Sequence, residues 1–133
     1  MLEQINGKEN RGLGWHIRNT GTWSITTAHA EIRFNLAHVP SGCGSVIMSE
    51  YSYNLSADNQ DDINELVEYF ENLFFNLKDD GVGSVITTIG ESSYGFLTKK
   101  LFDILGFKKI SEYSNYRHSS TGTYKQYLLM KEL

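Results

Sequence analysis

The sequence predicts an α/β protein in which helices pack against one mixed β-sheet. Segments with period-two apolar alternation come early and late in the chain, and two segments between them have apolar residues at helical spacing. A short β-branched segment separates the two predicted helices. A strand, a helix and a strand in that order imply a parallel pair joined by a right-handed crossover. Strand pairs before and after this unit add antiparallel neighbours, so the predicted fold class is α+β with a mixed sheet.

The chain has 133 residues, which suits a single domain spanning 1–133, because two domains would each bury too small a core. A net charge of −4 argues against broad binding to nucleic acid or anionic membranes, which need a basic face. The single cysteine, Cys43, excludes an intrachain disulfide and fits a reducing compartment. No apolar segment reaches the roughly 18 residues of a membrane span. We therefore expect a soluble, cytoplasmic protein.

The first strands are expected after a polar N-terminal segment. Residues 1–22 predict a loose lead-in, with room for a short strand near 15–18, and residues 23–133 form the predicted core. Alternation predicts a half-buried strand over 23–36. Residues 45–54 are apolar on both faces, which predicts a central strand. The side chains expected on the buried face of the 23–36 strand are Ala30, Ile32, Phe34 and Leu36.

The clearest element is a helix over 59–80, capped by Asp58 or Asn59 and ended by Gly81. A β-branched strand over 84–89 follows it. The apolar residues at helical spacing are Ile63, Leu66, Val67, Phe70, Leu73, Phe74 and Leu77.

A second helix is expected over 92–105, and Gly106 followed by Phe107 is typical of a left-handed helix end whose next apolar residue folds back. Strands over 107–117 and 124–131 close the chain. The predicted order is therefore β-β-α-β-α-β-β.

This order, with Leu105-Gly106-Phe107 followed by two strands, resembles the GCN5-related N-acetyltransferases, the GNAT family. The resemblance covers residues 23–133, and the family's N-terminal strand-helix-helix part is shortened here to residues 1–22. It implies a GNAT-like fold and transfer of an acetyl group from acetyl-CoA to an amine. The small size is also reminiscent of phage-encoded acetyltransferase-like proteins.

The family's pyrophosphate loop reads Gln or Arg, two variable residues, Gly, one variable residue, then Gly or Ala. Its glycines let backbone N–H groups approach the phosphates at a helix N-terminus. In the best register Gln60 matches, but Ile63 and Glu65 stand at the glycine positions, beside Asp61 and Asp62. Each carboxylate repels a phosphate by roughly 1 kcal/mol at ~4 Å in water-like surroundings. An ordinary acidic first turn of a helix remains the alternative.

The family's proton donor for the leaving thiolate is a tyrosine three residues before Leu-Gly-Phe, and this chain has Phe102 there. Tyr94 and Tyr113 are candidate replacements, with core or sheet tyrosines as the alternative. Glu50 stands alone among uncharged strand residues and is the candidate general base, with an outward-facing glutamate as the alternative.

The resemblance implies that acetyl-CoA is held by backbone groups in the 45–54 strand and by N–H groups at the start of the first helix. We expect an acyl-CoA-dependent N-acyltransferase of divergent type, with acyl-CoA and an amine acceptor as partners. The alternative is a GNAT-like protein without catalysis that binds or inhibits a protein partner. The histidines lack ligand spacing, so no metal is expected, nor is nucleic acid. The expected cofactor-binding residues are Ile47, Met48, Ser49, Tyr51, Asn59 and Gln60.

Overall fold

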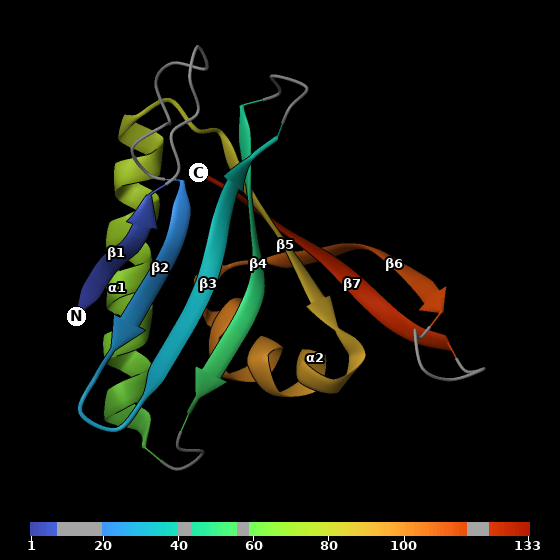
Figure 1. Ribbon diagram of the computed structural model, residues 1–133, viewed down its shortest axis with the longest axis horizontal. Coiled ribbons are helices and arrows are strands. Elements are labelled where there is room, and N and C mark those ends of the chain that lie inside the picture. The colour runs from blue at the N-terminus through green and yellow to red at the C-terminus, as the bar shows by residue number, and fades with distance from the viewer. Residues whose placement is uncertain (8–19, 40–43, 56–58, 117–122) are drawn as a thin grey trace.

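The computed structural model describes residues 1–7, 20–39, 44–55, 59–116 and 123–133, and shows one domain built on a seven-stranded mixed sheet (Figure 1). The strand order is β1-β2-β3-β4-β5-β7-β6. The β4–β5 pair is parallel and the other pairs are antiparallel. The predicted fold class is therefore confirmed. The strands are β1 (Leu2–Gly7), β2 (Gly21–Thr26), β3 (Glu31–His38), β4 (Ser45–Asn54), β5 (Ser84–Gly90), β6 (Lys108–Tyr116) and β7 (Thr123–Glu132).

The first helix, α1 (Gln60–Asp79), lies where its apolar spacing predicts, and Asn59 caps it. The second helical segment is one continuous run with a π-helical turn in its middle: α2 (Glu91–Leu97), η2 (Thr98–Phe102) and α3 (Asp103–Leu105). Gly106 ends it with φ +88°, the left-handed conformation that its sequence predicts. No helix among the described residues is long and apolar enough to span a lipid bilayer.

The N-terminal part differs from the expectation of a loose lead-in. β1 pairs with β2, and the predicted strand over 23–36 is two strands joined by a turn in which Thr27 N–H donates to the Ala30 carbonyl at 2.9 Å. The turn sequence Thr-Ala-His-Ala contains neither glycine nor proline, so no turn-forming residue in the sequence indicated this turn. The expected strand near 15–18, and Cys43, lie outside the described residues.

A chain of phenylalanine rings forms the centre of the core on one face of the sheet. Phe34 of β3 stacks on Phe70 of α1, with ring centroids 5.4 Å apart, and Phe70 contacts Phe74 at 5.9 Å. Phe74 meets Phe107 at 5.8 Å, and Phe107 meets Phe102 of η2 at 5.2 Å. These contacts hold α1 and the second helical segment against the same sheet face.

Candidate functional site: a cleft between β4 and β5

The cleft begins where the two parallel strands stop pairing. β4 and β5 pair from Ser45 opposite Ser84 to Met48 opposite Thr87 and no further, although β4 continues to Asn54. The strands then diverge, as Figure 1 shows. The carboxyl ends of parallel strands are where α/β sheets commonly bind ligands. The gap between β4 and β5 is therefore the first place to look for a site.

A β-bulge at Glu50 shapes the β4 side of this gap. The β3–β4 register shifts, so that Phe34 faces two β4 residues between the pairs Asn35–Ser49 and Arg33–Ser52. Glu50 has φ +59°, a left-handed conformation that a residue with a side chain seldom adopts. After Met48, the bulge reverses which β4 side chains face the helices and which face away. As a result Tyr51 turns toward the helices, where it contacts Phe102 edge-on at 5.6 Å.

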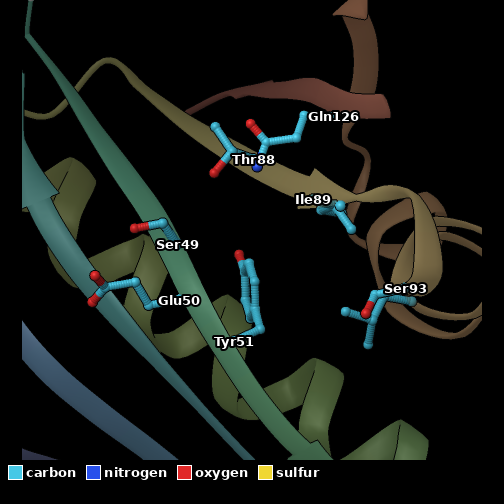
Figure 2. Close-up of a pocket in the computed structure, with 9 residues that line it drawn as sticks. Ser49, Glu50, Tyr51, Thr88, Ile89, Ser93 and Gln126 are labelled. Atoms are coloured by element: carbon cyan, nitrogen blue, oxygen red, sulfur yellow. The ribbon is translucent and has the colours of Figure 1, made fainter. Parts of the chain in front are cut away.

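The gap contains a cavity of about 330 Å³ (Figure 2). Ser49, Glu50 and Tyr51 form its β4 wall, and the other walls come from β5, the second helical segment and β7. In Figure 2 the Tyr51 ring lies between β4 and β5, while the Glu50 carboxylate extends from β4 away from β5. The remaining lining residues are Thr88, Ile89, Gly90, Ser93, Leu97 and Gln126.

A pair of hydrogen bonds joins the strands at the inner end of the cavity. The Thr87 hydroxyl donates to the Met48 carbonyl at 3.0 Å, so the bond between Tyr51 and Thr87 has the Tyr51 hydroxyl as its donor. Burial raises the pKa of the Tyr51 hydroxyl, and the hydrogen bond to Thr87 lowers it by less. A phenol with a raised pKa stays protonated. It therefore keeps the hydrogen that it donates to Thr87, and it is a poor source of a proton for a thiolate, whose conjugate acid has a pKa of about 8.5.

The outer end of β4 is tied to the second helical segment. The Tyr53 hydroxyl donates to Ser93 Oγ at 3.1 Å, and the Tyr53 ring stacks on Phe96 with centroids 5.9 Å apart. The cavity is thus framed by side chains fixed at both ends of the diverging part of β4.

The sequence-predicted cofactor positions on β4 fall into two groups. Ile47 and Met48 lie in the paired part of the strand, between Ala37 and Leu36 of β3 and Ile86 and Thr87 of β5. Ser49 and Tyr51 lie in the diverging part and line the cavity.

The two tyrosines predicted as proton donors are not among the residues that line the cavity. Tyr94 stacks on Tyr127 of β7, with ring centroids 3.8 Å apart and 16° between the planes. Tyr113 lies on the edge strand β6, is 42% exposed, and pairs across the sheet with Gln126. Phe102, the residue at the family's tyrosine position, is fully buried in the aromatic core.

The start of α1 holds the other predicted cofactor residues. The Asn59 side chain accepts a hydrogen bond from the Asp62 N–H at 3.2 Å, and the Gln60 side chain donates to Asn64 at 3.0 Å. The Asp62 carboxylate is 5% exposed and lies 3.1 Å from His29 Nδ1. The predicted capping by Asn59 is therefore confirmed, and these contacts are all internal to the protein.

Sequence reasoning missed six of the nine residues that line the cavity, including Thr88, Ser93 and Gln126. Thr88 could have been found, because it lies near the carboxyl end of the predicted parallel strand over 84–89, where such sheets commonly bind ligands. Gln126 and Ser93 come from elements distant in the chain, and nothing in their local sequence distinguishes them.

The sequence matches no protein-family model and no curated protein. The fold is nevertheless similar to solved acetyltransferase structures. The ribosomal-protein-S18-alanine N-acetyltransferase from Escherichia coli is 12% identical, with a TM-score of 0.61 over 99% of this chain and 92% of that one. An acetyltransferase from Bacillus subtilis in complex with CoA is 11% identical, with a TM-score of 0.53 over 89% of this chain and 80% of that one.

A longer neighbour is a probable acetyltransferase from Staphylococcus epidermidis, 11% identical with a TM-score of 0.58. The alignment covers 84% of this chain and 66% of that protein. The GNAT-like fold is therefore shown. None of these neighbours is described as a phage protein, so the resemblance to phage proteins stays a prediction.

The residues present fit one part of coenzyme A and not another. The cavity has hydroxyl, amide and apolar groups, which suit the neutral amide arm of pantetheine. The start of α1 has Ile63 and Glu65 at the glycine positions of the resemblance, with two carboxylates and a side-chain cap beside them, which does not suit a diphosphate.

Proposed function

We propose that this chain is a divergent N-acyltransferase that moves an acetyl group from a pantetheine thioester, acetyl-CoA in the first instance, to an amine. The observation that carries the proposal is the cavity between the diverging ends of β4 and β5, with a bulge at Glu50 on one wall. The GNAT-like fold of the chain supports it. The comparisons give no support to the alternative of a binding or inhibitory protein without catalysis.

Each wall of the cavity has a role in this proposal. Backbone and side-chain groups of Ser49 and Tyr51 hold the thioester arm, with Ile47 and Met48 fixing the strand beneath them. The bound thioester supplies an activated acetyl group. The exposed Glu50 takes a proton from the acceptor amine, through a water molecule because its carboxylate extends away from β5.

No candidate tyrosine from the sequence analysis lies where it could donate a proton to the leaving thiolate. Tyr94 and Tyr113 remain the candidates from the sequence, and neither lines the cavity. Tyr51 is closer, but its raised pKa suits hydrogen bonding better than proton transfer. We propose that solvent supplies this proton, in a protein that we expect to be cytoplasmic.

The first experiment is calorimetric titration with acetyl-CoA, supported by a thermal-shift scan and by mass spectrometry of a panel of amine acceptors. Micromolar binding would release about 8 kcal/mol of binding free energy and raise the melting temperature. Absence of both heat and shift with acetyl-CoA and with acetylpantetheine would refute the proposed function.

Glu50→Gln tests the base. We expect kcat to fall about 100-fold with little change in thioester affinity, because the amide keeps the shape of the side chain but takes no proton. Glu68→Gln, which removes one exposed carboxylate from α1, is the matched control and should leave kcat unchanged. Equal rates for the two variants would remove Glu50 from the mechanism.

A further inference from the structure

In the first turn of α1, backbone N–H groups are hydrogen-bonded within the protein. In an α-helix the first four N–H groups have no partner within the helix and can bind an anion. Here the Asn59 side chain accepts from Asp62 N–H at 3.2 Å, and the Asn59 carbonyl accepts from Ile63 N–H at 3.3 Å. The Ile63 bond is the first regular bond of the helix, so among the free donors of this turn the N–H of Asp62 is already occupied by the protein itself.

The same turn has a regular helical backbone where a phosphate loop would need an open one. Gln60 through Glu65 all lie within α1, and Ile63 is 2% exposed because its side chain packs in the core. A glycine loop lets a phosphate approach the backbone from outside. Ile63 instead anchors this backbone to the core, so the turn cannot open without losing buried apolar contacts.

The charges of this turn are also unfavourable for an anion. Asp61 is exposed in the first turn, and Asp62 is buried beside it. His29, from the turn between β2 and β3, is 67% exposed and contacts Asp62. Two carboxylates near the helix start cancel the attraction that the helix dipole offers a phosphate.

The cavity between β4 and β5 has the opposite character. Ser49, Thr88, Ser93 and Gln126 offer uncharged hydrogen-bonding groups, and Ile89 and Leu97 offer apolar surface. A pantetheine arm is a neutral chain with two amides and a terminal thioester. Groups of this kind match it without charge, and the one charged lining residue, Glu50, extends its carboxylate away from β5.

From this contrast we infer that the chain recognises its acyl donor by the pantetheine arm alone and makes no favourable contact with the diphosphate of coenzyme A. The inference rests on the proposed function and narrows it. The donor class is then acyl-pantetheine thioesters, whatever nucleotide or carrier is attached to the arm.

Competition calorimetry with three probes tests this inference: S-acetylpantetheine, acetyl-CoA and adenosine 3′,5′-bisphosphate. We expect the affinities for S-acetylpantetheine and acetyl-CoA to agree within about threefold. We expect adenosine 3′,5′-bisphosphate to give no heat at about millimolar concentration. Acetyl-CoA binding more than about thirtyfold tighter than S-acetylpantetheine would overturn the inference and leave the proposed function intact. Failure of both thioesters to bind would overturn both.

Asp61→Asn sharpens the test, because Asp61 is exposed and its side chain is outside the core. We expect the ratio of acetyl-CoA to S-acetylpantetheine affinity to rise about threefold to fivefold when one repulsive charge is removed. Glu68→Gln removes the same charge about 10 Å further along the helix axis and should leave the ratio unchanged. An unchanged ratio in Asp61→Asn, or an equal rise in Glu68→Gln, would contradict the local repulsion on which the inference depends.

Discussion

The cleft between β4 and β5 and the first turn of α1 lie next to each other in the chain, yet they offer ligands opposite surroundings. The cleft arises where strand pairing stops after Met48 and Thr87, and its walls are mostly uncharged. The helix start is capped by Asn59 and carries two carboxylates in its first turn. The resemblance to the GNAT family implies that both regions hold one donor, whereas the chemistry of the residues suits such a donor only in the cleft.

On the proposed function, the difference means that the fold keeps one half of a donor site without the other. Divergence of the strands is a property of the backbone, fixed by the bulge at Glu50 and by the pairing register. Phosphate binding at a helix start depends on a few side chains, and each of these can be replaced without disturbing the sheet.

Filling the cleft should have the largest effect. Gly90 lines the cavity in an ordinary backbone conformation, and a Cβ added there would meet no heavy atom within 4 Å. We expect Gly90→Phe to weaken S-acetylpantetheine binding at least about tenfold, because the ring occupies space that the arm needs. Gly95→Phe is the control, since Gly95 has similar room on α2 but does not line the cavity. Calorimetry measures both, and equal affinities would place the donor elsewhere.

Cutting the link between the strands should cost less. Tyr51→Phe removes the donor to Thr87, and we expect the free energy of unfolding to fall by about 1 kcal/mol. In a double-mutant cycle with Thr87→Val the coupling should also be about 1 kcal/mol. Tyr53→Phe removes the 3.1 Å hydrogen bond to Ser93 at the outer end of β4, and about 0.5 kcal/mol is expected. Denaturant unfolding measures these values, and additive losses at Tyr51 and Thr87 would show that their contact stabilises nothing.

The smallest effect concerns the free energy of unfolding at acid pH. The pKa of Asp62 is lowered first by the nearby Thr27 side chain and also by His29, against opposing desolvation. Since the folded-state pKa is below the unfolded one, the stabilisation is complete above about pH 4 and disappears as pH falls through the folded value. Asp62→Asn should therefore lose its stability deficit relative to wild type at low pH. Unfolding curves between about pH 2 and pH 7 would show this, and a constant deficit would contradict it.

Much of the scaffold could be predicted from the sequence. The helical spacing from Ile63 to Leu77 predicted α1, the apolar faces of residues 45–54 predicted β4 as a central strand, and Gly106 predicted the end of the second helical segment. Patterns of this kind repeat over many residues, so one misplaced side chain does not hide them.

The N-terminal strands and the bulge could not be predicted in the same way. β1 is a short strand defined by its pairing with β2, and the turn between β2 and β3 has no glycine or proline. The left-handed conformation at Glu50 contradicts local preference, since glycine, asparagine or aspartate is usual there.

The sequence by itself determined the order of the central elements, the apolar faces of α1 and β4, and the acidic first turn with Phe102 three residues before Leu105. These are properties of residues close together in the chain. Only the tertiary structure decided that Tyr51 faces the helices, that Ser93 and Gln126 meet Ser49 around one cavity, and that Tyr94 and Tyr113 do not line it. The physical reason is that strand register and a single bulge set which side chains share a face, and both depend on pairing between segments far apart in the sequence.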